Sequence, residues 1–159
     1  MNGPGVTHPT TERTAIMKNI RFYLLGMFLG MLLTGCATPG PKFSNYLATL
    51  SPPPTGQGRI WFYRAPWMAN GVNVKVALDN VEVGKSKSGS FFEVTTTPGT
   101  HVICVADDRK RELTVPVTTN ADTYVQCYVT PGLFSPHIIP TVMNEADALR
   151  GLKDLTYAK

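Results

Sequence analysis

The side chains that could carry out acid–base, metal or nucleophilic chemistry are few in this sequence and lie far apart. His101 follows a Pro-Gly-Thr turn, and His137 lies in a proline-bounded loop. Neither histidine has a partner at the spacing of a zinc site, and Cys104 and Cys127 lack Cys-x-x-Cys spacing. The sequence contains no Gly-x-Ser-x-Gly motif and no glycine-rich phosphate-binding loop. We therefore expect no catalytic residue, no metal, no cofactor and no enzymatic activity.

Aromatic side chains offer a second kind of chemistry, which is binding by stacking. Trp67 lies in the loop after Pro66, and Tyr124 and Tyr128 share one face of a predicted strand. If the three are exposed together, they could stack on sugar rings or anchor a protein partner. The alternative is that they close the edge of the core and pack beneath a C-terminal helix, which is the commoner use in a small domain.

The composition is that of one globular domain. The chain has 159 residues, of which 43% are hydrophobic and 16% charged, and a formal charge of +4. The residues before Cys36 hold three basic and one acidic side chain, so the chain from Cys36 onward carries +2. This mixed surface has no block of basic residues, and we expect no nucleic-acid partner.

The amino-terminal region resembles the signal segment of a bacterial lipoprotein. Lys18 and Arg21 precede an apolar run from Phe22 to Leu33, and the run ends in Leu32-Leu33-Thr34-Gly35-Cys36, which resembles a lipobox. The run is shorter than the about 20 residues that span a bilayer. The resemblance implies cleavage before Cys36, a diacylglyceryl group on its sulfur and an acyl chain on its amine. The alternatives are a transmembrane anchor and a chance cysteine after an ordinary signal peptide.

The interpretation as a lipoprotein divides the amino-terminal part of the chain into segments. Residues 1–16 lack any signal-like pattern and are interpreted as a gene-model extension, and residues 17–35 as the lipoprotein signal peptide. Three acyl chains exceed what stable membrane anchoring requires. Position 37 is Ala rather than Asp, and the sorting rule known for enterobacterial lipoproteins then implies the outer membrane, facing the periplasm.

Cys104 and Cys127 are the cysteines that remain if Cys36 is lipidated. An oxidising periplasm favours a disulfide between them. Closing the loop between them would contribute about 3 kcal/mol through the unfolded state. The alternative is that both are buried thiols that act as small hydrophobic residues. We expect the disulfide.

Residues 36–57 form the lipid-attachment site and a proline-rich tether. The prolines restrict the backbone and favour extended chain. Between them, Phe43, Tyr46, Leu47 and Leu50 recur at helix-like spacing. They predict a short helical turn, which packs on the domain or lies on the membrane surface; we favour packing.

From Gly58 the hydrophobic pattern has a period of two, which predicts strands. Asp79-Asn80 separates two alternating segments and predicts a tight hairpin. Asn144 can cap a helix whose first turn carries Glu145 and Asp147. An apolar stripe follows and consists of Ala148, Leu149, Leu152 and Leu155. About seven short strands predict an all-β fold, an antiparallel β-sandwich with a short C-terminal helix. The predicted strands are 59–64, 72–78, 81–84, 91–95, 101–106, 112–117 and 122–129, with 138–143 as a further candidate.

The domain at residues 58–159 resembles a family of small uncharacterised bacterial lipoproteins related to PEGA-type β-sandwich domains. The resemblance lies in Gly58–Arg64, in Val76–Gly84 and in Thr97–His101. It implies a fold rather than an activity, because these motifs are structural. Asn80 stands where the family more often has glycine, and Thr100 replaces a small or acidic residue.

These observations predict a non-enzymatic lipoprotein that is held in the membrane through Cys36 and binds another protein of the cell envelope. The alternative is a module that binds peptidoglycan or exported polysaccharide, and a hydrolase is a distant third. A protein partner predicts an apolar surface near Trp67 or on the loop from Pro131 to Pro140.

Overall fold

The computed structural model describes residues 39–66, 71–106, 110–133 and 137–158. The predicted gene-model extension, the signal peptide, Cys36 and Trp67 lie outside these ranges. The described residues belong to one compact unit, Pro39–Lys159. The segment from residue 39 to residue 57, which the sequence assigns to the tether, is therefore part of the folded domain.

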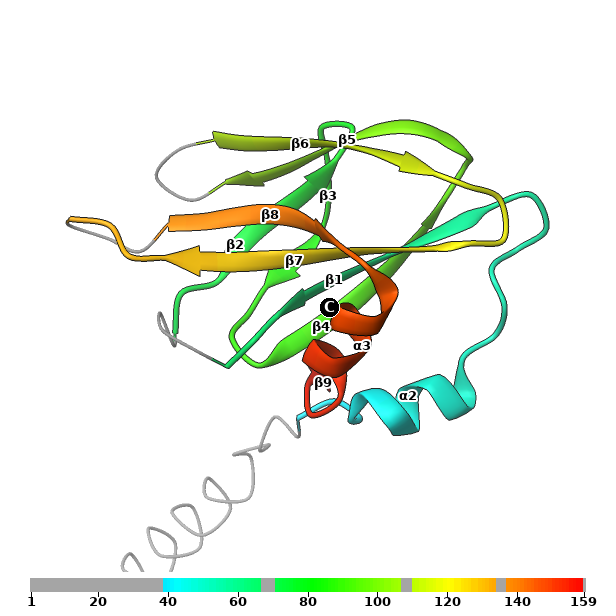
Figure 1. Ribbon diagram of the computed structural model, residues 1–159, viewed down its shortest axis with the longest axis horizontal. Helices are drawn as coiled ribbons and strands as arrows, with labels where there is room; N and C mark the ends of the chain where they lie inside the picture. Colours follow the sequence, from blue (N-terminus) through cyan, green and yellow to red (C-terminus); the bar gives the residue numbers. More distant parts are fainter. Residues whose placement is uncertain (1–38, 67–70, 107–109, 134–136, 159) are drawn as a thin grey trace, which may run out of the picture. The chain divides into compact units, whose positions relative to one another are not determined.

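The described chain folds as a β-sandwich of two sheets (Figure 1). The predicted all-β class and the C-terminal helix are confirmed. One sheet has five strands in the order β8-β7-β1-β4-β9, and the other has four in the order β3-β2-β5-β6. The strands are β1 (Gly58–Arg64), β2 (Val74–Leu78), β3 (Val81–Ser86), β4 (Ser90–Thr96), β5 (Gly99–Ala106), β6 (Lys110–Val117), β7 (Asp122–Thr130), β8 (His137–Met143) and β9 (Thr156–Tyr157).

Most of the strand pairings are antiparallel, as predicted, and two are parallel. β1 runs antiparallel to β4 but parallel to β7, and the two-residue β9 runs parallel to β4. In both parallel pairs the partners are far apart in sequence, so no tight turn dictates their direction. The alternation of apolar and polar residues predicts where strands lie, but it does not predict which distant strand each one pairs with.

The hairpin between β2 and β3 forms as predicted. Asp79 and Asn80 have φ angles of 49° and 68°, the left-handed backbone that tight two-residue hairpin turns require. Asn and Asp tolerate this conformation better than other side-chain-bearing residues. The replacement of the family's usual glycine by Asn80 therefore leaves the turn intact.

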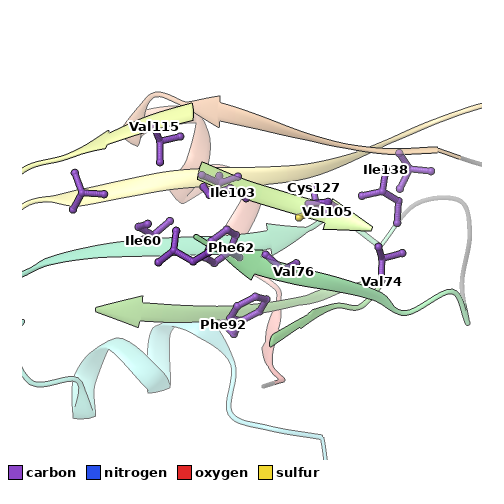
Figure 2. Close-up of a cluster of buried hydrophobic side chains, with 14 residues drawn as sticks. Ile60, Phe62, Val74, Val76, Phe92, Ile103, Val105, Val115, Cys127 and Ile138 are labelled. Carbon is purple, nitrogen blue, oxygen red and sulfur yellow. The ribbon is translucent and has the colours of Figure 1, made fainter. Parts of the chain in front are cut away.

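The main core lies between the two sheets (Figure 2). Alternation along each strand directs one set of apolar side chains into this space, where they are removed from water. Phe62 and Phe92 stack within it with ring centroids 4.9 Å apart. The buried members are Ile60, Phe62, Val74, Val76, Leu78, Phe92, Ile103, Val105, Val115, Val117, Val125, Cys127, Val129 and Ile138.

A second core lies on the outer face of the five-stranded sheet, beneath two helices, α2 (Phe43–Thr49) and α3 (Glu145–Leu152). Figure 1 shows both helices and β9 on the same side of the sandwich. The packed position that we favoured for the helical turn in the tether is the one observed. The buried members of this second core are Phe43, Trp61, Tyr63, Phe91, Tyr124, Ala148, Leu152 and Leu155.

Helix α3 begins where the sequence indicates. The Asn144 side chain accepts a hydrogen bond of 2.9 Å from the Asp147 N–H and so caps the first turn. Ala148 and Leu152 are buried, whereas Leu149 is 38% exposed. The helix ends at Leu152, and Leu155 packs from the turn that follows it. The apolar stripe is thus narrower than predicted and extends past the helix.

The replacement Phe43→Ala tests whether the amino-terminal segment belongs to the domain. Phe43 is 5% exposed and its ring lies 5.4 Å from Trp61 and 5.2 Å from Phe91. We expect the free energy of unfolding to fall by about 3 kcal/mol in urea denaturation, because a buried aromatic side chain is removed. The matched control is Leu47→Ala in the same helix, where the side chain is 42% exposed; its effect should stay within about 0.5 kcal/mol. Equal effects would show that α2 is not packed on the domain.

Candidate binding surface

Strand β7 carries two of the three predicted binding residues, and the structure separates them. Val125, Cys127 and Val129 face the inter-sheet core, so Tyr124 and Tyr128 share the outer face, as the alternation predicts. Tyr124 is 6% exposed, whereas Tyr128 is 48% exposed. The two tyrosines therefore do not form one exposed aromatic surface.

Helix α3 causes the difference. It packs on β7, and Tyr124 lies with Ala148 and Leu152 in the second core. Tyr128 lies four residues further along the strand, about 13 Å at the rise of an extended chain. It therefore stays uncovered. For Tyr124, the alternative interpretation, packing beneath a C-terminal helix, is the observed one.

The exposed end of this hairpin presents a small apolar surface, which we call the β7–β8 surface and define as Tyr128, Leu133 and Ile139. Ile139 pairs with Tyr128 in the β7–β8 register and belongs to neither core cluster. Leu133 lies in the connection between the two strands and is 90% exposed. Two exposed apolar side chains beside the half-buried Ile139 mark a candidate interaction site.

A small hollow lies beside Tyr128 and is lined by Arg64, Ala65, Gln126, Cys127, Tyr128 and Val129. Its volume is about 30 Å³, which is room for water but not for an organic substrate. Arg64 is only 1% exposed, and its guanidinium donates hydrogen bonds to the carbonyls of Val72 (2.9 Å) and Ser86 (3.3 Å). Burial lowers the pKa of Arg64. The arginine thus holds main-chain segments together in the interior.

A larger and more open hollow of about 260 Å³ lies beside the start of α3. Burial raises the pKa of Tyr124, which lines it, to about 12, and the nearby Asp122 and Glu145 carboxylates add to the effect. The Tyr124 hydroxyl is therefore protonated at neutral pH and is no base. The lining residues are Pro116, Asp122, Thr123, Tyr124, Val142, Met143 and Glu145.

The expected disulfide is absent, because Cys104 and Cys127 are both free and buried. Cys127 faces the inter-sheet core, whereas Cys104 alternates with the core residues Ile103 and Val105 and so faces the other side of its sheet. Burial raises the pKa of the Cys127 thiol to about 11, so this thiol is unreactive. The alternative of two small hydrophobic residues describes the structure.

His101 is held on both ring nitrogens. Nδ1 lies 2.6 Å from an Asp79 carboxylate oxygen, and Nε2 lies 2.8 Å from the Thr97 carbonyl. Both partners accept hydrogen bonds, so the doubly protonated ring satisfies them together. The Asp79 bond raises the pKa of His101, against the opposing effect of burial. Because neither nitrogen is open to a substrate, this pair ties two turns together and is not a catalytic dyad.

Three further predictions concern a metal site, a membrane-spanning helix and the role of Trp67. Among the residues that the structure describes, no three His, Cys, Asp or Glu side chains are grouped so as to hold a metal ion. No helix in that part of the chain is both long and apolar enough to cross a membrane. Trp67 lies outside the described residues, and its role stays a prediction.

The sequence predicts a surface on the loop from Pro131 to Pro140, and it does not point to Leu133 or Ile139 individually. A signal for Ile139 exists in the sequence. Ile138 and Ile139 are adjacent in one strand, so their side chains must face opposite sides. Only Ile138 is needed in the inter-sheet core.

Comparison with known proteins adds little information about the fold or the function of this chain. No protein-family model matches the chain, and no curated protein matches it. Among solved structures, the N-terminal domain of AlgF from P. aeruginosa matches with 15% sequence identity and a TM-score of 0.32. The match covers 55% of this chain and 95% of the AlgF domain. A likeness of this extent carries no argument about function.

The His101–Asp79 pair makes stability depend on pH. The pKa of His101 is raised in the folded protein. The contribution of His101 to the free energy of unfolding is therefore complete below the ordinary pKa of 6.5, and it is lost as pH rises through the higher folded-state pKa. Hydrogen bonds from the Val102 N–H and, to a smaller extent, from His101 lower the pKa of Asp79. The contribution of Asp79 to the free energy of unfolding is therefore lost only when pH falls below its ordinary pKa of 3.8. We expect the melting temperature to fall by a few degrees as pH rises from 6 to 9.

The variant Asp79→Asn is the control, because Asn tolerates the left-handed backbone at this position. Its melting temperature should change less over the same pH range, since the carboxylate that favours the protonated ring is gone. Parallel curves for the two proteins would contradict the role assigned to the pair.

Proposed function

We propose that this chain is a lipid-anchored protein of the bacterial cell envelope that binds another envelope protein and has no catalytic activity. The observation that supports the binding role is the β7–β8 surface. The helices cover one end of the outer face of the five-stranded sheet, while Tyr128 and Leu133 remain exposed at the other, with the half-buried Ile139 paired to Tyr128. A half-exposed tyrosine beside aliphatic side chains is a typical anchor for a protein partner.

The geometry favours a protein partner over a glycan. Stacking on consecutive sugar rings needs several exposed aromatic faces, and Tyr124 is covered by α3. Leu133, which is 90% exposed, offers apolar contact but no stacking and no hydrogen bond to a sugar. A glycan-binding role would therefore depend on Tyr128 and on residues outside the described part of the chain.

The membrane link rests on the lipobox resemblance at Cys36. The mature protein should begin at Cys36 and carry the added mass of one diacylglyceryl group and one acyl chain. We expect Cys36→Ser to lack this added mass, because the thiol that carries the diacylglyceryl group is gone. Cys104→Ser is the matched control and should keep it, since Cys104 is buried in the fold. A wild-type protein without added mass would refute the lipid anchor.

The partner-binding role is tested at the β7–β8 surface. A photocrosslinking amino acid in place of Leu133 should form a protein adduct in cells. The same group in place of Val81 should not, although Val81 is 65% exposed on β3. Tyr128→Ala should weaken binding of the captured partner by about 2 kcal/mol, or roughly 30-fold, as expected of a central aromatic anchor.

Two results would overturn this assignment. Equal adducts from the Leu133 and Val81 positions would show that the surface is not specific. Retention on purified peptidoglycan that Tyr128→Ala abolishes, without any protein adduct, would favour the glycan-binding alternative.

A further inference from the structure

The amino-terminal segment is clamped to the domain by the carboxyl-terminal one. The Tyr157 N–H donates to the Pro41 carbonyl at 2.9 Å, and the Phe43 N–H donates to the Leu155 carbonyl at 3.0 Å. Between these two bonds, Lys42 and Thr156 form an antiparallel bridge. Residues 41–43 are therefore held by backbone hydrogen bonds to residues 155–157, and we call this pairing the clamp.

Side chains reinforce this clamp. The Tyr46 ring stacks on the Tyr157 ring, with centroids 4.6 Å apart and planes 12° from parallel. The Tyr46 hydroxyl donates a hydrogen bond of 2.9 Å to the Glu93 carboxylate on β4. Phe43 fits edge-on against Trp61 and Phe91. The segment is thus fixed by the sheet beneath it as well as by the chain beside it.

The clamp reaches back as far as Gly40. A methyl group at this position would overlap the carbonyl oxygen of Tyr157, so only glycine allows this approach. The chain is consequently fixed to the domain from Gly40 onward. The tether that the sequence predicts up to Gln57 is mostly not free.

The position of the clamp limits how far the domain can lie from Cys36. The four residues that lead from Cys36 to Gly40 span at most about 14 Å when fully extended. A free tether of 21 residues up to Gln57 would span about 70 Å. The clamp therefore removes most of the reach that the sequence suggests.

The surface beside the clamp suits contact with lipid. The seven residues of α2 carry no charge, and Leu47 is 42% exposed among small polar side chains. Lys42, which bridges to Thr156 of β9, is exposed, and so are Lys153 and Asp154 shortly before β9 in the chain. The outer face of the other sheet carries the exposed Lys75–Glu82 ion pair and the exposed Glu112. On the helical side, exposed charges such as Glu145 and Arg150 belong to α3 and not to α2.

We propose that the sandwich rests directly on the membrane that carries its lipid anchor, with α2 at the level of the lipid headgroups. This inference depends on the lipid anchor at Cys36. Burying an uncharged helix with an exposed leucine at the interface is favourable, and lysines beside it attract lipid phosphates. Docking a charged sheet face there would require its ions to lose water.

The test places a fluorophore on the lipidated full chain in vesicles of phosphatidylethanolamine and phosphatidylglycerol that contain a nitroxide-labelled lipid. The labelled variants are Leu47→Cys on α2 and Val102→Cys on the outer face of β5, whose parent side chains are 42% and 38% exposed. Cys104 and Cys127 are buried in the folded protein, so the unsubstituted chain serves as the labelling control. We expect severalfold stronger quenching at Leu47 than at Val102.

Equal quenching at the two positions of a lipidated, vesicle-bound protein would overturn this inference and leave the anchor intact. A protein without added lipid mass that stays in solution would instead refute the anchor. Adding Gly40→Ala to the Leu47→Cys chain should open the clamp and lower the quenching towards that of Val102. Unchanged quenching would show that the clamp does not hold α2 at the membrane.

Discussion

The complete burial of β1 is the constraint on which the rest of the structure depends. All seven residues of this strand are buried, so it needs cover on both faces. Ile60 and Phe62 obtain it from the four-stranded sheet, while Trp61 and Tyr63 obtain it from the helices. A two-layer sandwich alone would leave a tryptophan and a tyrosine in water. The segments on either side of the sandwich in sequence are therefore required parts of the domain.

The two ends of β1 carry arginines, and both are buried by the same arrangement. Arg59 is 5% exposed, lies 5.5 Å from the Trp61 ring centre and donates to the Ser51 carbonyl at 2.6 Å. Arg64 donates to main-chain carbonyls at the other end. A buried guanidinium is costly unless its donors are satisfied, so each arginine holds the loops that supply those carbonyls. Through Ser51, Arg59 also holds the end of the amino-terminal segment.

Local pattern predicted the elements of this fold well, because alternation and turn residues act within a few positions of one another. The β2–β3 hairpin at Asp79-Asn80 and the Asn144 cap are both present. The parallel β1–β7 pair, the short β9 and the clamp were not predicted. Each depends on contacts between segments far apart in the chain, as between Tyr157 and Pro41, and no local pattern encodes them.

The candidate site was predicted less completely for the same reason. Tyr124 and Tyr128 have the same residue type and the same strand face, and only the path of α3 makes one buried and the other exposed. Likewise, Cys104 and Cys127 fit the sequence rules for a disulfide. Which face of its sheet each one occupies is decided by the packing of the two sheets.

The arrangement of one sheet connects the two proposed surfaces. Helix α2 covers Trp61 on β1 and Phe91 on β4, and the β7–β8 surface lies on the same outer face. In the strand order β8-β7-β1-β4, three inter-strand spacings separate β8 from β4, about 14 Å across the sheet. If α2 lies at the lipid headgroups, a partner bound at Tyr128 must also lie close to the membrane. On the proposed docking of α2, we therefore expect a partner that is itself embedded in or attached to that membrane.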